Sequence, residues 1–253
     1  HRLPMIALIP AAGSGTRMGA AVSNSKIFHE FSTGHTVLEL VFRNIIQSGV
    51  CDRIIVASRE DDIPQVERVV AKACQGFPVT VIPGGQTRQQ SVLFALGECP
   101  RRTDYVLVHD GARPFCGPEL IQRVCRAARE SQAAILALQS TSTLKFAPER
   151  HETTETLKRE LVWMAQTPQV FSFQLYMKAQ DAAHEAGFEG TDDAQLVERL
   201  GHPVTLVPGS PYNIKLTTPE DLDYAEFLLR GAWAHQLADF EESPLPVGKP
   251  ARY

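Results

Sequence analysis

The strongest structural signal in this chain is the sequence MIALIPAAGSGTRMG, residues 5–19. The apolar run 6–9 predicts a short strand buried on both faces, and Pro10 ends it because proline has no N–H to donate to a sheet. Residues 11–15 carry so little side-chain bulk that their backbone can curl and direct several N–H groups at one anion, and Arg17 adds a cation. An ordinary glycine-rich turn is the alternative, but it needs neither this length nor an arginine. We therefore predict a phosphate-binding loop.

The spacing of the glycines argues against the two commonest phosphate-binding motifs. No G-x-x-x-x-G-K-S/T string occurs in the chain, and the G-x-G-x-x-G pattern would need glycine where Met18 stands. The acid expected about twenty residues later would be Glu39, which lies in a helical pattern and does not end a strand. The loop instead resembles the A-x-G-x-G-S/T-R-M/L-G signature of sugar-nucleotide-type nucleotidyltransferases, and Lys26 supplies the lysine that follows this signature.

Composition narrows the class of protein. The chain has 253 residues, of which 43% are hydrophobic and 21% charged, so it can bury the core of one α/β domain. A net charge of −4 without a basic cluster argues against nucleic acid as a partner. No apolar run approaches the roughly 18 residues of a membrane helix, which argues against a membrane partner. The five scattered cysteines, without a C-x-x-C pair, predict reduced thiols and a cytoplasmic location.

Hydrophobic patterning predicts strands and helices in alternation. Strands are expected at residues 6–9, 53–58, 79–82, 105–108, 134–138, 204–207 and 213–216. Helices are expected at residues 37–47, 63–73, 86–96, 119–129, 172–185, 194–200 and 218–230. Such alternation is typical of βαβ units and predicts a Rossmann-like α/β fold, with a mainly parallel sheet flanked by helices. Right-handed crossovers would place the carboxyl end of every strand at one edge of the sheet.

Two segments depart from this alternation. Residues 139–167 are rich in Ser, Thr, Glu, Lys and Arg and are too long for an ordinary connection, which predicts a functional, flexible or protruding arm. Residues 231–253 end in a stretch with three prolines and are expected to form a loosely ordered tail. We therefore predict one domain, residues 1–230, followed by this tail.

Polar residues follow two of the predicted strands, at the edge where ligands bind in open α/β sheets. In the run HDGARP, residues 109–114, Asp110 is suited to bind magnesium or a ribose, and Arg113 to hold a phosphate. A plain turn closed by the aspartate is the alternative. The glycine pair 84–85 lets the backbone approach a base or sugar, and Ser91 is placed to donate to the base.

Five of these stretches occur in an informative order: residues 10–19, 84–91, 109–114, 167–169 (TPQ) and 213–221 (NIKLTTPED). The ordered set resembles the 2-C-methyl-D-erythritol 4-phosphate cytidylyltransferase family of the non-mevalonate isoprenoid pathway. The resemblance implies transfer of a cytidylyl group from CTP to a phosphorylated polyol, with a magnesium cofactor. It also implies a homodimer in which a β-arm crosses to the partner, so that each active site combines groups from both chains.

The resemblance further implies a role for each matching residue. The CTP site would consist of Pro10, Ala11, Ala12, Gly13, Ser14, Gly15, Gly84, Gly85, Ser91, Asp110 and Gly111. The acceptor would be held by Arg113, Thr143, Arg159, Thr167 and Lys215. Arg17 and Lys26 would stabilise the transition state, Lys215 and Arg159 would complete the catalytic set, and Asp110 would be the magnesium ligand.

The chemistry of such a transfer suits a set rich in cations. The attacking phosphate oxygen is already largely ionised at neutral pH, so no general base is required. The enzyme must instead hold two anions together and stabilise charge on the α-phosphate. Three other functions stay open: a cytidylyltransferase for another polyol phosphate such as ribitol 5-phosphate, a non-catalytic nucleotide sensor, and a nicotinamide oxidoreductase. The cations disfavour the sensor, and the spacing of the loop disfavours the oxidoreductase.

Overall fold

The fold is seen in a computed structural model in which residues 4–13 and 26–242 are described. The main sheet has seven strands in the order β3-β2-β1-β4-β8-β5-β9. They are β1 (Met5–Ala11), β2 (Arg53–Ser58), β3 (Val79–Pro83), β4 (Tyr105–Val108), β5 (Ala133–Gln139), β8 (Trp163–Ser172) and β9 (Thr205–Pro208). The helices are α1 (Val37–Ser48), α2 (Ile63–Ala73), α3 (Arg88–Gly97), α4 (Pro118–Ser131), α5 (Phe173–Ala186), α6 (Asp193–Glu198), α7 (Pro219–Arg230) and α8 (Ala234–Glu242). None of these helices is both long and apolar enough to cross a membrane.

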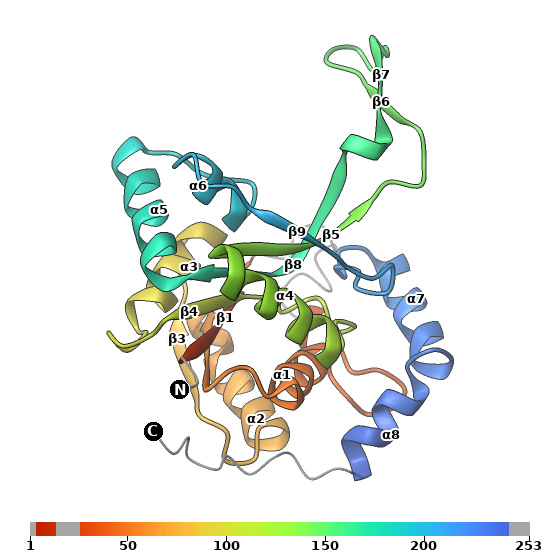
Figure 1. Cartoon of the computed structure of the whole chain (residues 1–253). Coiled ribbons are helices and arrows are strands. Elements are labelled where there is room, and N and C mark those ends of the chain that lie inside the picture. The colour runs from red at the N-terminus through yellow and green to blue at the C-terminus, as the bar shows by residue number, and fades with distance from the viewer. Residues whose placement is uncertain (1–3, 14–25, 243–253) are drawn as a thin grey trace.

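Helices cover both faces of the sheet, which confirms the predicted α/β class (Figure 1). The core on one face joins α1, α2, α4, α7 and α8, and the core on the other joins α3, α5 and α6. Successive side chains of β1 point to opposite faces. Met5, Ala7 and Ile9 therefore enter the first core, while Ile6 and Leu8 enter the second. The apolar run is uninterrupted because this central strand has no solvent-facing side.

The strand order reverses beside β1, and this reversal creates the site. β1 pairs in parallel with both β2 and β4. The chain first builds β2 and β3 on one side of β1 and then crosses to β4 on the other side. The connection from β1 leads toward β2 and the connection from β4 leads the other way, toward β5, so the two segments diverge and leave a crevice between the carboxyl ends of β1 and β4. Residues 10–13 and 109–113 border this crevice.

The sequence patterns did not predict β8, since residues 163–167 were assigned to the arm, and β8 breaks the expectation that every strand ends at one edge. This strand runs antiparallel between β4 and β5. The reason lies in its connection to β5, which contains no crossover helix and returns the chain directly along its neighbour. The amino-terminal half of β8, with Thr167, is consequently brought to the edge where the other strands end.

Within the predicted arm 139–167, residues 140–162 leave the sheet, while residues 163–167 already belong to β8. A hairpin of β6 (Leu144–Phe146) and β7 (Glu155–Leu157) occupies its far end, and the short 3-10 turn η4 (Arg159–Leu161) leads back to β8. Figure 1 shows this arm projecting away from the helices and the sheet.

Three local expectations are corrected by the structure. Pro10 does not end the first strand, because β1 stays paired with β2 through Ala11. Residues 213–216 form no strand, because their backbone bonds to the turn after β4: Leu216 N–H donates to Ala112 O at 2.9 Å. The first part of the expected loose tail is the helix α8, which buries Leu237 and Phe240 against the core. Arg43 on α1 donates to Phe240 O at 3.4 Å and so joins the two helices.

Candidate active site

A cavity of about 180 Å³ lies where β1 and β4 end. Its wall is made of Pro10, Ala11, Ala12, Gly13, Lys26, Ile27, Asp62, Arg88, Ser91, Asp110, Gly111, Ala112 and Lys215. The 3-10 turn η2 (Lys26–Phe28) presents Lys26 here because the next two residues, Ile27 and Phe28, are buried and anchor it. Residues 10–13 of the predicted phosphate loop therefore face the same cavity as two of the predicted cations, Lys26 and Lys215. Ser14, Gly15 and Arg17 lie outside the described residues.

The start of α3 forms another side of this cavity through Arg88 and Ser91, while the predicted residues Gly84 and Gly85 lie in the connection before it and do not line the cavity. Gly84 is required there, since a Cβ atom on it would collide with the side chains of Ala12 and Ser91. The N–H of Gly85 donates to Ser91 Oγ at 3.0 Å, which orients the serine hydroxyl. Thr87 then caps α3 by accepting the N–H of the helix's third residue at 3.1 Å. This cap starts the helix two residues later than expected and directs Arg88 toward the cavity.

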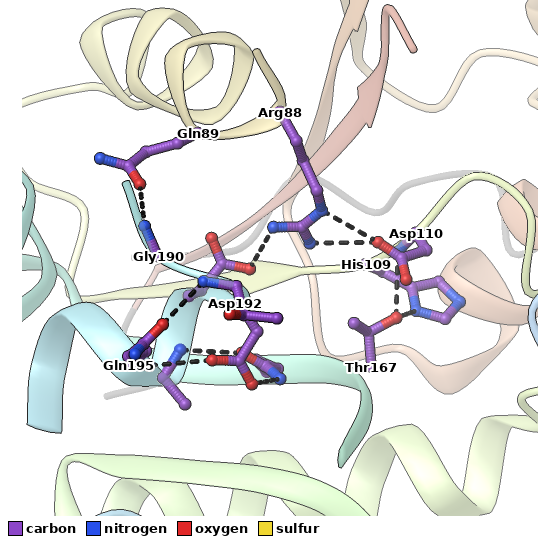
Figure 2. Close-up of polar contacts among 12 residues, drawn as sticks. Arg88, Gln89, His109, Asp110, Thr167, Gly190, Asp192 and Gln195 are labelled. Atoms are coloured by element: carbon purple, nitrogen blue, oxygen red, sulfur yellow. Dashed lines mark hydrogen bonds and ion pairs between the residues drawn. The ribbon is translucent and has the colours of Figure 1, made fainter. Parts of the chain in front are cut away.

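Three cations surround the buried carboxylate of Asp110. Arg88 donates to Oδ1 at 3.1 and 3.3 Å, Arg113 donates to Oδ2 at 3.2 Å, and Lys215 Nζ lies 3.7 Å from Oδ2. Burial alone would raise the pKa of Asp110, but Arg88, Lys215 and Arg113 together outweigh it and hold this pKa well below its usual range. Asp110 is therefore ionised and fixes the positions of all three cations. Figure 2 shows the contact with Arg88.

A second cavity, of about 480 Å³, adjoins the first. It is lined by Arg88, Asp110, Arg113, Ala165, Gln166, Thr167, Gln169, Thr191, Asp192, Gln195, Glu198 and Lys215. The two cavities share Arg88, Asp110 and Lys215. Two anionic ligands could therefore bind on opposite sides of one charged cluster.

Interactions from Arg88 and β8 hold the far wall of the second cavity. Arg88 donates to Asp193 at 2.9 Å, and Gln169 donates to Asp192 Oδ2 at 2.9 Å. Gln89 accepts the N–H of Gly190 at 2.8 Å, so the first turn of α3 also fastens the loop before α6. These residues had no assigned role in the sequence. Among these residues, only Arg88 could have been identified as a site residue from the sequence, because it lies at the start of a helix directly after the glycine turn.

Two predicted acceptor-binding residues lie on the arm and line neither cavity of their own chain. Thr143 is exposed beside β6, and exposed Arg159 donates to Thr141 O at 3.1 Å. The other predicted acceptor-binding residues, Arg113, Thr167 and Lys215, line the second cavity.

The imidazole of His109 is enclosed between Thr167 and the turn that follows β4. Nδ1 lies 2.8 Å from Thr167 Oγ1, and Nε2 lies 3.2 Å from Arg113 O. Burial lowers the pKa of His109 to about 4, Asp110 opposes this shift, and Arg113 adds to it. The ring is therefore neutral at physiological pH.

We expect the protein to lose stability as the pH falls from 6.5 to about 4, because the unfolded chain binds a proton at His109 that the folded chain does not. The full loss in the free energy of unfolding is about 3 kcal/mol, since one pKa unit corresponds to about 1.4 kcal/mol. Urea unfolding across this pH range, in metal-free buffer, measures the loss in the free energy of unfolding. His35, whose pKa burial also lowers, contributes with the same sign. Comparison with His109→Asn isolates the part due to His109, and equal pH slopes in the two proteins would contradict the assignment.

Metal ligands are sparse in the described part of the chain. No group of three or more His, Cys, Asp or Glu side chains is arranged there to hold an ion. Asp110 is the one deeply buried acid shared by the two cavities among the residues described. A divalent metal held by Asp110 would therefore need further oxygen ligands from beyond the described residues, such as substrate phosphates or water.

The geometry agrees with the relatives of this sequence. A family model described as 2-C-methyl-D-erythritol 4-phosphate cytidylyltransferase matches residues 5–231. The enzyme of that name from Bacillus mycoides is 42% identical over 222 residues, which are 88% of this chain and 96% of the relative. The crystal structure of 4-diphosphocytidyl-2C-methyl-D-erythritol synthase from Anaerococcus prevotii superposes with a TM-score of 0.80 at 31% identity, covering 91% of this chain and 100% of the other. The crystal structure of 2-C-methyl-D-erythritol 4-phosphate cytidylyltransferase from Thermus thermophilus superposes with a TM-score of 0.73 at 36% identity. This superposition covers 90% of this chain and 99% of the other. The chain therefore belongs to the 2-C-methyl-D-erythritol 4-phosphate cytidylyltransferase family.

Proposed function

We propose that this chain transfers the cytidylyl group of CTP to 2-C-methyl-D-erythritol 4-phosphate and releases diphosphate. The observation that carries the proposal is the pair of adjoining cavities with a shared wall of Arg88, Asp110 and Lys215. A nucleotide in the first cavity and a phosphorylated acceptor in the second would meet at that wall. Membership of the family supports the identity of both substrates.

The reaction is a substitution at phosphorus. An oxygen of the acceptor's phosphate forms a bond to the α-phosphorus of CTP, the bond from that phosphorus to the bridging oxygen breaks, and diphosphate leaves with the electron pair. The attacking oxygen carries no proton that must be removed at neutral pH. The residues therefore contribute by positioning two anions and by stabilising the charge that develops during the transfer.

We assign CTP to the first cavity and the acceptor to the second. The backbone of residues 10–15 would hold the triphosphate, and Gly85 with Ser91 would contact the cytosine. Lys26 and Arg17 would stabilise the α-phosphate in the transition state. The acceptor's phosphate would bind the cations of the second cavity, Arg113 and Lys215, with Thr167 in its wall.

Magnesium forms part of the proposal as the partner of CTP. Mg²⁺ prefers oxygen ligands and is commonly held by one or two carboxylates together with substrate phosphates. The single carboxylate of Asp110 fits that pattern. When bound, the ion would neutralise charge on the triphosphate, while Arg88, Arg113 and Lys215 keep Asp110 ionised and in place.

A homodimer with shared active sites is the second part of the proposal. Arg159 and Thr143 line neither cavity of their own chain, yet both match acceptor-binding positions of the family. The arm that carries them also exposes apolar side chains: Leu161 is 74% and Met164 is 50% exposed. Such side chains on a projecting element favour burial against a second copy. A cytoplasmic location completes the proposal and rests on the five cysteines, all of which are free thiols.

We expect purified protein to release diphosphate from CTP when Mg²⁺ and 2-C-methyl-D-erythritol 4-phosphate are present, and to do so more slowly with ribitol 5-phosphate. Assays without acceptor, and with ATP in place of CTP, serve as controls. Equal or faster release with ribitol 5-phosphate would assign the chain a different polyol phosphate. No release with either acceptor would favour the non-catalytic nucleotide sensor.

A further inference from the structure

The guanidinium of Arg88 is held between two buried carboxylates from different parts of the chain. It donates to Asp110 Oδ1, on the turn after β4, at 3.1 and 3.3 Å (Figure 2). On its other side, Nη1 donates to Oδ2 of Asp193, the first residue of α6, at 2.9 Å. The side chains of Asp110 and Asp193 are 9% and 2% exposed. Arg88 therefore joins the start of α3 to both of these segments.

Asp193 is linked to the site through Arg88. It lines neither of the two cavities, whereas Arg88 lines both. The second carboxylate oxygen of Asp193 accepts the hydroxyl proton of Tyr176, a fully buried residue of α5. The backbone of Asp193 is fixed separately, because Asp192 caps α6 by accepting the N–H of Gln195 at 2.9 Å. The carboxylate of Asp193 is thus anchored on the side away from the cavities.

This anchor determines what Arg88 can contact. The Arg88 side chain is 31% exposed and lines both cavities, so a guanidinium released from Asp193 would lie within reach of a bound phosphate. Guanidinium groups bind phosphate oxygens strongly, often through two parallel hydrogen bonds. In the structure, Arg88 instead directs its donors at carboxylates on both of its sides.

We propose that Asp193 is a positioning residue for Arg88, and that it keeps this guanidinium on Asp110 and away from the phosphates of the substrates. The inference deepens the proposed transferase function and rests on it. A cation that pairs with a phosphate in the ground state stabilises the bound nucleotide and does not speed the transfer. With Arg88 restrained, the substrate phosphates are left to the other cations that line the cavities, which are Lys26, Arg113 and Lys215.

Three substitutions separate this role from simple packing. Asp193→Ala removes both oxygens and releases Arg88. Asp193→Asn keeps one acceptor oxygen, although Tyr176 and Arg88 both donate to the native carboxylate, so the amide can satisfy only one of them. Tyr176→Phe is the matched control, because it removes the hydroxyl bond between α5 and α6 and leaves the carboxylate for Arg88.

Binding of inorganic diphosphate, measured by calorimetry on the full chain, tests the proposal without reference to activity. We expect Asp193→Ala to bind diphosphate about tenfold more tightly than the wild type, because the released Arg88 gains a hydrogen bond between charged groups. Asp193→Asn should show a smaller gain, and it decides the test if the alanine variant does not fold. Tyr176→Phe should bind as the wild type does. Unchanged or weaker binding in the Asp193 variants, including no binding by any of the proteins, would overturn the proposal.

An Arg88→Gln background distinguishes the restraint of Arg88 from the mere loss of a negative charge. If Asp193 acts through Arg88, its substitution in this background should give no gain in diphosphate affinity, because the two residues form one unit. A charge effect through space would give the same gain in both backgrounds, and that result would also overturn the proposal. Thermal unfolding shows which of the variants are folded.

Steady-state kinetics then test the consequence for the proposed transfer. We expect Asp193→Ala to lower kcat and the KM for CTP together, each about tenfold, so that kcat/KM changes little. A raised KM for CTP at unchanged kcat would show that Asp193 promotes binding, which contradicts the positioning role. An inactive wild-type protein would instead refute the transferase function, while the diphosphate measurements would still decide how Arg88 is held.

Discussion

Lys26→Ala and Arg159→Ala chains, each nearly inactive alone, are expected to regain roughly a quarter of wild-type activity when they are unfolded together and refolded. The reason is the proposed exchange of arms across a two-fold axis, which combines Lys26 of one chain with Arg159 of the other. In a mixed dimer one site then carries both substitutions and the other carries neither. Random pairing makes half of the dimers mixed, so about a quarter of all sites are intact. The diphosphate-release assay measures this recovery.

The positions of the two residues make this experiment discriminating. Lys26 lines the first cavity, whereas Arg159 lies in η4 on the projecting arm and is exposed to solvent. Lys26→Ala mixed with Lys215→Ala is the matched control, because both of these lysines line one cavity of the same chain. Every site in that mixture keeps one substitution, and no activity should return. If the first mixture also stays inactive while light scattering confirms dimers, the shared-site proposal is wrong.

Lys26→Ala is expected to lower kcat by about a hundredfold or more and to change the acceptor KM little. Charge on the α-phosphate develops mainly in the transition state, so a cation placed beside it contributes to kcat rather than to ground-state binding. Loss of one such electrostatic contact typically costs this much. Steady-state kinetics with both substrates varied would measure the effect. The same result is expected for Arg17→Ala, at a position outside the described residues.

A lysine remote from both cavities provides the control for this experiment. Lys178 is exposed on α5, and Lys178→Ala removes the same charge without touching the site. We expect its kcat to stay near that of the wild type. A near-normal kcat for Lys26→Ala would show that this lysine, which the sequence places in Ser25-Lys26-Ile27, has no catalytic role.

The buried strands and their following turns were predictable because their signals are local. The apolar run 6–9 and the small residues after it were enough to predict β1 and the loop at its end, since few other structures bury such a run. Asp110 was predictable as a site residue for a similar reason: it directly follows a buried strand, where parallel sheets bind ligands. The helix Val37–Ser48 likewise follows from its apolar spacing.

Sequence patterns predicted the wrong structure for segments that bond to or pack against residues far away in the chain. Residues 213–216 look like a strand, but the backbone there bonds to the turn after β4, where Arg113 also donates to Asn213 O at 2.7 Å. The tail was expected to be loose because its prolines dominate its composition, yet Phe240 and Leu237 of α8 pack on the core before those prolines begin.

The chain's own residues thus specify the class of fold, the order of its main elements and the turns that carry the charged groups, because hydrophobic period and strand ends are properties of neighbouring residues. Neither the presence of β8 nor its direction is such a property. Its first residues were assigned to the polar arm, and only the pairing of this strand between β4 and β5 brings Thr167 to His109. In the same way Lys215 and Arg88 meet at Asp110 through packing of distant segments, since the free energy that selects those contacts is gained only when the whole core has closed.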